Sequence, residues 1–528
     1  MTEFTNYLTS YRAHLLKHIR GVFSFSSTQG MTEPEIKAYV KRLTNESAIP
    51  IPAATFEWLG QFVRYIRERD TLLVYSNQTG LWKMEQDDMF LQNLLTDYFS
   101  LINEEATAVK DEIFRRYAQN FFGVGKIPHL VKRIKKAIFY TIERSADVVQ
   151  STEHYRYFNT VEGKRALLDM SKGTFNLRTV SFKETQPMLL QHIAPTPIST
   201  TDEEPKLWLS LIKQYMMNDP ERIEYFEKVL AYLMSPYNYN QALLYFIGEK
   251  GRNGKSTVVK VLQDILGPHA VRMNSDLLNS HPPSSFKKDD ALAATEGKSL
   301  LIFNEIDERM EVSTRNVKDM TEGGRDEFGN KIMTVLRPAY SKNYEVNICG
   351  IPLLIANSLI NFGDWSALEP MFRRMVLVPF DYVIKKEDPT ILNKLAEEYP
   401  KIQTWLYMNY FKHKGIAIKD VVRPPDVERK FVQYRNDSDI IGMYWSDCIE
   451  VTYKLEDSML RSDLYRSYER YCKMNGRRPI RNKGTNGFTN LIEPYIPKGL
   501  LVLRSGSWYV QGIKFTPYFE KEVKTFGI

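Results

Sequence analysis

The chain has 528 residues and a net charge of +7 at neutral pH, and its composition is 43% hydrophobic and 26% charged. This length exceeds what one hydrophobic core organises, so we expect three or four domains of an ordinary globular protein. No run of about 18 apolar residues occurs, which argues against a membrane-spanning helix. The first residues lack the pattern of a signal peptide, and the three cysteines form no CxxC pair. We therefore expect a cytoplasmic protein without disulfide bonds or a zinc site.

The N-terminal part of the chain mixes helical and strand-like patterns. Residues 1–64 predict a helical segment. In residues 65–200, TLLVYSNQTGLWKM predicts a β-hairpin and SKGTFNLRTVSFKET alternates in the manner of a strand. Residues 194–205, APTPISTTDEEP, are rich in proline, serine, threonine and acids, which is typical of a linker. We expect an α+β domain at 65–200 that this linker separates from the rest.

Strands and helices alternate between residues 206 and 385. The apolar strands are ALLYFIG, KSLLIFNEIDE, GIPLLIAN and MVLVPF. This alternation predicts an α/β domain with a mainly parallel sheet. Residues 386–440 predict a helical connector. Residues 441–528 combine helices with a terminal hairpin, GLLVLRSGSWYVQGI.

The stretch IGEKGRNGKST (247–257) nearly fits a phosphate-binding loop, and it lies between an apolar strand and an amphipathic helix. Glu249 stands where the pattern has its first glycine, and Gly248 lies one position earlier. In this setting backbone N–H groups and the positive helix end face an anion, Lys255 reaches the β and γ phosphates, and the Ser256 hydroxyl binds Mg²⁺. A basic turn that matches by chance is the alternative. The predicted ATP-binding residues are Gly248, Gly251, Asn253, Gly254, Lys255, Ser256 and Thr257.

A nucleotide site of this kind also needs an acid at a strand end, to hold the metal and activate water. Glu305 is the first acid after the apolar run LLIF, and Asp307 follows two positions later. We expect Ser256 and Glu305 to hold Mg²⁺. A charged loop that simply ends the strand is the alternative.

Two further features follow along the chain. Asn357 ends the strand PLLIAN, where a polar side chain beside the γ phosphate orients the attacking water. Arg373 and Arg374 stand just before the strand MVLVPF, and one of them could cross to a neighbouring subunit to stabilise transition-state charge. A structural ion pair is the alternative for the arginines.

These features occur in the order found in superfamily 3 helicases. The chain resembles the phage/plasmid primase–helicase family, which includes the poxvirus nucleoside triphosphatase, in GRNGKST, SLLIFNEID, VKDMTEGGRDEF, LLIAN and FRRMVLVPF. The resemblance covers about residues 65–528, and the layout is also similar to replication initiator helicases of staphylococcal pathogenicity islands. It implies a central AAA+-type ATPase domain and a homo-hexameric ring that binds ATP between subunits. Such a ring translocates on single-stranded DNA in its channel, usually 3′ to 5′.

The resemblance also implies where DNA binds. In such rings a hairpin enters the channel, and here KIMTVLRPAYSKNYEV, with Lys331, Lys342 and Tyr344, is the candidate. A lysine neutralises backbone phosphate and a tyrosine stacks on a base, whereas an ordinary polar turn is the alternative.

Duplex DNA, expected to be the origin of a mobile element, is assigned to the C-terminal part. Residues 461–483 carry eight Lys/Arg against two acids, and residues 125–144 form a second basic cluster. A solvated helix face is the alternative for either cluster. The C-terminal part resembles a winged helix with NGFTNLIEPY as the groove-facing helix and LRSGSW as the wing, and docking of a protein partner is the alternative. The predicted DNA contacts there are Arg477, Arg478, Arg481 and Lys483.

Departures from the family pattern keep other functions open. Glu249 alters the loop entrance, and Asn304 stands where related helicases often carry a second acid. Residues 1–200 show no D-h-D pair with a downstream histidine at a strand end, which makes primase activity a secondary hypothesis. The competing readings are a primase–helicase with a divergent primase site and an ATP-switched origin-binding scaffold that does not translocate.

Overall fold

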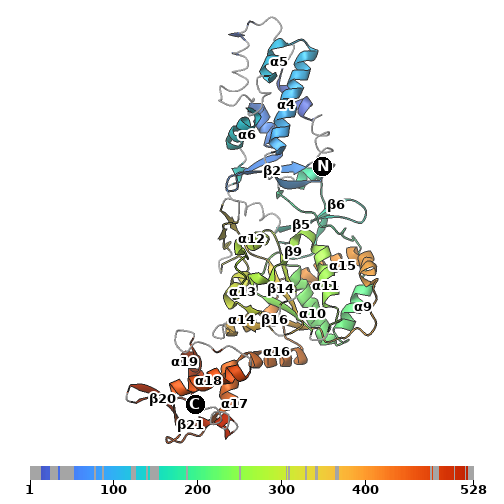
Figure 1. Cartoon of the computed structure of the whole chain (residues 1–528). Helices are drawn as coiled ribbons and strands as arrows, with labels where there is room; N and C mark the ends of the chain where they lie inside the picture. Colours follow the sequence, from blue (N-terminus) through green and yellow to red (C-terminus); the bar gives the residue numbers. More distant parts are fainter. Residues whose placement is uncertain are drawn as a thin grey trace.

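The computed structural model of the protein describes residues 14–23, 32, 34–35, 38, 53–76, 79–85, 89–119, 126–137, 141–142, 154–185, 188–201, 203–248, 251–304, 306, 310–326, 330–338, 343–358, 360–362, 368–475, 479, 487–504, 506–517 and 519–520. The chain forms an elongated molecule, with an N-terminal domain at one end, a central α/β domain, and a small domain at the other end (Figure 1). No helix among these residues is long and apolar enough to cross a membrane.

The N-terminal domain packs helices on a four-stranded sheet of order β3-β2-β1-β4. The hairpin expected in this region is confirmed, because β2 pairs antiparallel with β3. Its buried core joins Leu15 and Ile19 to Leu59 and to residues as far as Ile134, so the boundary expected at residue 64 does not divide two cores. The elements are a helical stretch at 14–22, α3 (Ala53–Leu59), β1 (Val63–Ile66), β2 (Thr71–Ser76), β3 (Leu81–Glu85), α4 (Met89–Ala108), α5 (Glu112–Gln119), α6 (Lys126–Ala137) and β4 (Thr141–Ile142).

A three-stranded sheet, β5 (Tyr155–Asn159), β6 (Arg165–Asp169) and β7 (Leu177–Thr179), lies between this domain and the central one (Figure 1). Side chains alternate between the two faces of a strand. Accordingly, Tyr157 packs in a cluster with Leu81 of β3, whereas the next residue, Phe158, belongs to the core of the central domain. The short helix α8 (Phe182–Thr185) follows the sheet.

The prediction of a linker at residues 194–205 is wrong for the first half of that segment. The Ala194 N–H donates to the Tyr157 carbonyl oxygen at 2.8 Å, and the Ile198 N–H donates to that of Asn159 at 2.8 Å. Ala194 is 5% exposed and Ile198 is fully buried in the central core. The segment therefore runs along the edge of β5, because burial of its two apolar side chains lowers the free energy relative to leaving them in water.

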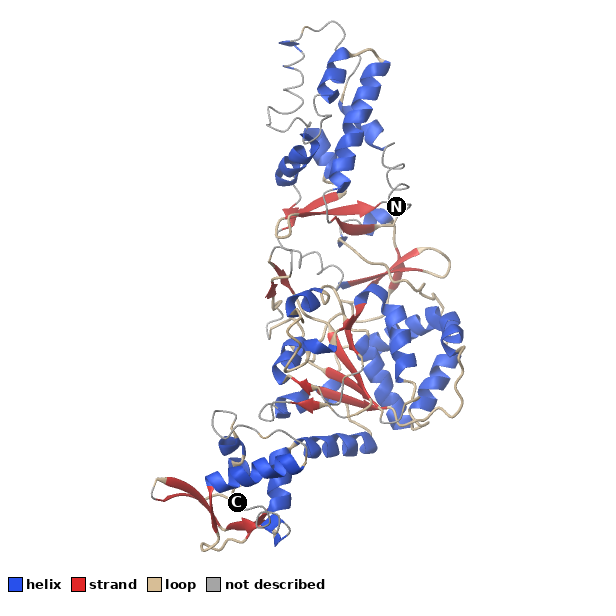
Figure 2. Cartoon of the chain, in the orientation of Figure 1, coloured by secondary structure: helices blue, strands red, loops and turns tan. Residues whose placement is uncertain are grey.

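The central domain is built on five parallel strands in the order β16-β8-β14-β10-β9, which confirms the parallel α/β prediction. Both faces of this sheet are covered by helices, so β8, β10 and β16 are buried at every position (Figure 2). The strands are β8 (Leu243–Ile247), β9 (Ala270–Met273), β10 (Leu300–Phe303), β14 (Ile351–Ala356) and β16 (Met375–Pro379), with the short strands β11 (Glu311–Val312), β12 (Thr334–Leu336), β13 (Tyr344–Val346) and β15 (Asn361–Phe362) outside the sheet.

The helices of the central domain divide into two layers. Leu244 and Phe246 of β8 pack in a cluster with α9, α10, α11 and α15, whereas Leu243 and Tyr245 face a cluster that includes α13 and α14. The helical connector expected at 386–440 is helical, but Leu406 of α15 and Val427 of α16 are part of the first core. The helices are α9 (Lys206–Tyr215), α10 (Pro220–Leu233), α11 (Lys255–Leu266), α12 (Lys288–Ala293), α13 (Thr314–Thr321), α14 (Leu368–Arg374), α15 (Ile391–His413) and α16 (Pro425–Ser438), with 3₁₀ turns η3 (Gly267–His269), η4 (Ser275–Leu277) and η6 (Ile418–Asp420).

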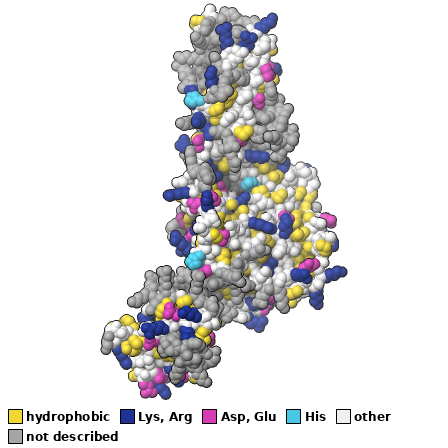
Figure 3. All heavy atoms as spheres, viewed as in Figure 1, with side chains coloured by type: hydrophobic (Ala, Val, Ile, Leu, Met, Phe, Trp, Pro, Cys, Tyr) yellow, Lys and Arg dark blue, Asp and Glu magenta, His cyan; other side chains and the backbone are white. Residues whose placement is uncertain are grey.

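The C-terminal domain has its own core, which runs from Ile440 to Phe519. The hairpin expected near the end of the chain is confirmed by the antiparallel pairing of β19 with β20. Basic side chains lie beside hydrophobic ones on its visible face (Figure 3). Its elements are α17 (Ile440–Cys448), β17 (Ile449–Val451), β18 (Ser458–Leu460), α18 (Arg461–Met474), α19 (Phe488–Leu491), η7 (Glu493–Tyr495), β19 (Leu501–Arg504), β20 (Ser507–Gln511) and β21 (Ile513–Phe515).

Candidate functional site

The loop after β8 lies at the carboxyl edge of the central sheet, where parallel α/β sheets bind their ligands. Parallel pairing aligns Ala356 of β14 and Pro379 of β16 with Ile247 of β8. The residues that follow these strands, Gly248, Asn357 and Phe380, therefore lie side by side at this edge.

Gly248 resolves the irregular glycine spacing of the loop. A Cβ atom at this position would overlap the Asn253 side-chain amide and would lie 2.8 Å from both Lys255 Nζ and the Phe380 carbonyl oxygen. The glycine is therefore needed one position earlier than the usual pattern places it, because three groups converge on its α carbon. Glu249 lies outside the described residues.

Lys255 is the first residue of α11 and is only 4% exposed. Its Nζ donates to the Gly248 carbonyl oxygen at 2.9 Å and to Asn357 Oδ1 at 3.0 Å. Within the part of the chain that the structure describes, it forms no ion pair with a carboxylate. Burial lowers the pKa of Lys255 to about 8. A cation held by two neutral oxygens and short of a counter-charge is suited to binding an anion such as phosphate.

Gly254 is the N-cap of α11, the helix that follows the loop, and has a φ of 88°. A Cβ atom there would meet the Tyr215 ring at 2.5–2.7 Å, so the backbone is pressed onto this ring. Tyr215, at the end of α9, also shares a hydrogen bond with the Thr257 side chain. Tyr215 is not among the residues predicted from the sequence, and its only signal there is an aromatic side chain at the end of the helix α9.

The segment that follows β16 also contacts the loop after β8. The Ile384 N–H donates to the Arg252 carbonyl oxygen at 2.8 Å, and Arg252 Nε pairs with Glu387 at 2.8 Å. Arg252 has a φ of 60°, a left-handed conformation that costs a non-glycine residue about 1 kcal/mol or more. The backbone contact to Ile384 is therefore what holds it, since the ion pair is exposed and contributes little.

All seven residues of the predicted ATP-binding set are described, and three of them, Gly248, Asn253 and Lys255, converge. Asn253 is 4% exposed, whereas Ser256 faces solvent from the first turn of α11 and Thr257 is half-buried. At Gly251 an added Cβ would meet none of the described atoms within 4 Å, so this part of the loop is open to a ligand. An exposed hydroxyl beside a buried lysine is a donor set that fits Mg²⁺ and a phosphate chain.

The predicted acids cannot be placed. β10 ends at the same edge as β14, in the register Phe303 to Leu354, and Asn304 follows it half-buried. Glu305 and Asp307 lie outside the described residues, so their roles stay predictions. Among the described side chains no group of three or more His, Cys, Asp or Glu could hold a metal ion.

Arg373 and Arg374 lie at the opposite edge of the sheet. They precede Met375, which pairs with Leu243 at the start of β8, so the five-residue strand β16 separates them from the loop by roughly 16 Å. Arg374 is half-buried and donates to the Pro370 carbonyl oxygen at 2.9 Å. Burial, together with the neighbouring Arg373 charge, lowers the pKa of Arg374. The structure does not bring these arginines to Lys255 of the same chain.

The hairpin expected to contact DNA is present, since β12 pairs antiparallel with β13 in the register Leu336 to Tyr344. Tyr344 is half-buried, and the Arg69 guanidinium lies 3.9 Å from its ring centroid. Lys331 precedes β12, and its backbone pairs with that of Arg325 in an isolated antiparallel β-bridge. Lys342 lies outside the described residues.

The other DNA-binding residues predicted from the sequence lie outside the described residues as well. These are Arg477, Arg478, Arg481 and Lys483. The expected groove-facing helix is represented by α19, which has four residues and is followed by the 3₁₀ turn η7.

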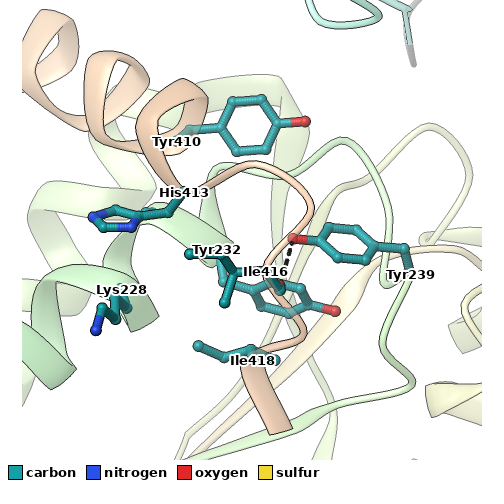
Figure 4. Close-up of a pocket in the computed structure, with 8 residues that line it drawn as sticks. Lys228, Tyr232, Tyr239, Tyr410, His413, Ile416 and Ile418 are labelled. Carbon is teal, nitrogen blue, oxygen red and sulfur yellow. Dashed lines mark hydrogen bonds between the residues drawn. The ribbon is translucent and has the colours of Figure 1, made fainter. Parts of the chain in front are cut away.

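A small pocket lies elsewhere, between α10 and the end of α15 (Figure 4). It is lined by tyrosines, and the Tyr239 hydroxyl donates to the Ile416 carbonyl oxygen at 3.4 Å. The Tyr232 hydroxyl donates to Asn238, which in turn donates to the Ala242 carbonyl oxygen just before β8. The pocket is therefore near the amino edge of the sheet and separate from the Lys255 site.

No protein-family model matches the chain. It is 22% identical over 439 residues to "Putative helicase L207/L206" of Acanthamoeba polyphaga mimivirus, a match that covers 76% of this chain and 44% of that protein. It is 21% identical over 433 residues to "Putative primase C962R" of African swine fever virus, covering 76% and 43%. The chain thus spans less than half the length of these curated relatives. The solved C-terminal region of NrS-1 is 14% identical, with a TM-score of 0.37, and the match covers 70% of this chain and 99% of that one.

Proposed function

We propose that the chain is an ATP-hydrolysing motor that acts on DNA as a replicative helicase. The observation that carries this is the buried Lys255, which begins the helix of a strand–loop–helix unit and lacks a counter-charge among the described residues. The viral relatives, named as a helicase and as a primase, support the choice of DNA as the substrate.

Each residue of the site has a role in this proposal. Backbone N–H groups of the loop and the N-terminus of α11 bind the phosphates, and Lys255 moves from its two neutral acceptors to the β and γ phosphates. Ser256 and Glu305 would hold Mg²⁺, which neutralises charge on the phosphates. Asn357, 3.0 Å from Lys255, orients water, and Asp307 assists Glu305.

The finer architecture is also a proposal. We infer an AAA+-type domain of the superfamily 3 class that assembles as a homo-hexamer around single-stranded DNA and moves 3′ to 5′. The position of Arg373 and Arg374 at the far edge of the sheet supports action in a neighbouring subunit, because neither reaches its own loop. The C-terminal domain would bind the origin of a mobile element as a winged helix.

The decisive experiment measures DNA-stimulated ATP hydrolysis and strand separation for the wild type and Lys255→Ala. Lys260→Ala is a matched control, because Lys260 lies on the same helix, exposed and paired with Asp264. We expect both activities to vanish in Lys255→Ala and to persist in Lys260→Ala. Normal unwinding by Lys255→Ala would sink the assignment.

Subunit mixing tests the arginines. Lys255→Ala and Arg374→Ala proteins, each inactive alone, should recover part of the ATPase activity when mixed, because one subunit then completes its neighbour's site. A mixture as inactive as its components would place both residues in the same site.

Primase activity is the second candidate, since one group of relatives is named as primases. Template-directed primer synthesis by this chain would support it, and its failure with several templates and metals would remove it. A DNA-binding scaffold without translocation is distinguished by strand displacement on a long fork, which a pure binder cannot perform.

A further inference from the structure

The turn between β1 and β2 contacts the central domain at three points, two of them on the β12–β13 hairpin. The Arg69 guanidinium lies 3.9 Å from the Tyr344 ring centroid and pairs with Glu296 at 2.5 Å. The Glu345 backbone N–H donates to the Glu68 carboxylate at 2.6 Å. Arg69 and Glu296 are 18% and 19% exposed, so the contact is largely shielded from water.

One face of the Tyr344 ring is covered in this arrangement. It lies under the Arg69 guanidinium, and the half-buried side chain packs against the buried cluster of the central domain that includes Leu336 and Val346. A nucleic-acid base that stacks on an aromatic side chain needs one face of the ring. The face under Arg69 can therefore accept a base only if the guanidinium leaves it.

The contact is also incompletely satisfied. Arg69 Nε and Glu296 Oε1 are both buried and have no hydrogen-bond partner among the described residues. Unpaired buried polar atoms lower the stability of the arrangement that contains them. Separation of the two surfaces returns both atoms to water, which favours a contact that opens over one that is permanent.

We propose that Arg69 competes with single-stranded DNA for Tyr344, so that docking of the β1–β2 turn and base stacking exclude each other. This rests on the proposed function, in which the β12–β13 hairpin binds DNA. By linkage, whatever weakens the docked contact strengthens DNA binding by the same factor. The N-terminal domain thus restrains the DNA-binding hairpin until a strand displaces it.

The test is the affinity of the full chain for a fluorescent oligothymidylate, together with the DNA concentration that half-maximally stimulates its ATPase. Simple electrostatics predicts that loss of a positive charge weakens DNA binding. Competition predicts the opposite sign, namely that Arg69→Ala binds roughly three- to tenfold more tightly, the range expected when a stacked cation is removed from a tyrosine. Arg69→Lys should gain less.

Two further variants complete the design. Lys83→Ala removes one charge from an exposed position of the same sheet and should bind DNA no more tightly than the wild type. In Tyr344→Ala, the additional change Arg69→Ala should no longer raise the affinity. Basal ATPase and thermal stability, measured for every variant, show that the fold and the ATP site are intact.

The outcomes separate this inference from the proposed function. A wild-type chain that binds no DNA, or hydrolyses no ATP, refutes the function itself. If the wild type does both and Arg69→Ala binds DNA equally or less tightly, the function stands and the competition is wrong. A gain that persists without Tyr344 also overturns it.

Discussion

Gly248→Ala tests the geometry of the site more sharply than removal of its lysine. The added methyl group would overlap the Asn253 amide and lie 2.8 Å from Lys255 Nζ and the Phe380 carbonyl oxygen. The backbone of Phe380 is anchored beside this carbonyl, because its N–H donates to the Ile247 carbonyl oxygen at 2.7 Å just beyond the pairing of β8 with β16. Asn253, 4% exposed, has little room either. Both the Asn253 amide, which the added carbon overlaps, and Lys255 Nζ must therefore move.

The magnitude follows from these contacts. Overpacking of a tight interior costs about 1–3 kcal/mol, and each kcal/mol lowers the Tm of a domain of this size by about 2–4 °C. We therefore expect the Tm to fall by roughly 2–12 °C. Displacement of Lys255 removes charge-assisted hydrogen bonds worth about 1.5–3 kcal/mol each, so kcat/KM for ATP should fall by about 10- to 150-fold.

Gly251→Ala is the matched comparison, since an added Cβ there meets none of the described atoms within 4 Å. Its Tm, measured by differential scanning fluorimetry without nucleotide, should stay at the wild-type value. If Gly248→Ala also keeps the wild-type Tm and kcat/KM, then Gly248, Asn253 and Lys255 do not converge as described, and the explanation of the shifted glycine fails.

Three further predictions address the charge and stability of the central domain. Because burial lowers the pKa of Lys255 to about 8, this side chain loses its proton in the unliganded site as the pH rises through 8, whereas bound phosphate favours the charged form. Calorimetry in buffers of different ionisation enthalpy should therefore show that ATP binding takes up almost no protons at pH 7 and close to one at pH 9. The absence of proton uptake at pH 9 would contradict this prediction. Arg222, 7% exposed, pairs with Asp381 at 2.7 Å and with Asp426, so Arg222→Ala should destabilise the protein by about 3–5 kcal/mol in urea unfolding. Burial opposes ionisation of these two acids, yet the hydrogen bonds from Lys430 to Asp381 and from Arg222 to both outweigh it and lower the pKa of each. Their contribution to stability is therefore present above the unfolded pKa near 4 and lost as the pH falls through the lower folded values. This loss should be smaller in Arg222→Ala, in which only Lys430 remains to lower the pKa of Asp381. Asp219 caps α10 by accepting from the Glu221 and Arg222 N–H groups, and Asp219→Ala should cost about 1 kcal/mol, whereas a wild-type midpoint would mean that the cap is not formed.

The central sheet was predictable because its signals are local. Apolar strands such as β8 and β10 are buried on both faces and read as continuous hydrophobic runs, and the glycines of the loop mark where the strand gives way to α11. The approach of Lys255 to Asn357 also follows from the sequence, since parallel strands end at one edge.

Contacts between distant segments were not predictable in the same way. The shared core of Leu15 and Ile134, and the contacts of Tyr215 with Gly254 and of Arg69 with Tyr344, join residues that share no periodic pattern. The composition of residues 194–205 correctly indicates an irregular backbone, but it does not report that Ala194 and Ile198 are anchored to β5. Composition indicates the local backbone conformation of a segment, but not which distant residues it packs against.

The sheet β5–β7 has a consequence for how this protein can be divided. Its strands give alternate side chains to two different cores, and the segment along β5 adds two more to the central one. A cut at residue 205 would therefore remove Phe158, Leu168, Ala194 and Ile198 from the core of the central domain. Each such side chain contributes about 1.5–3 kcal/mol when buried, apart from the smaller Ala194. The smallest fragment that keeps the core of the central domain intact therefore begins no later than residue 154. A chimaera that exchanges the N-terminal domain would have to join the two chains before the β5–β7 sheet, which belongs to both cores.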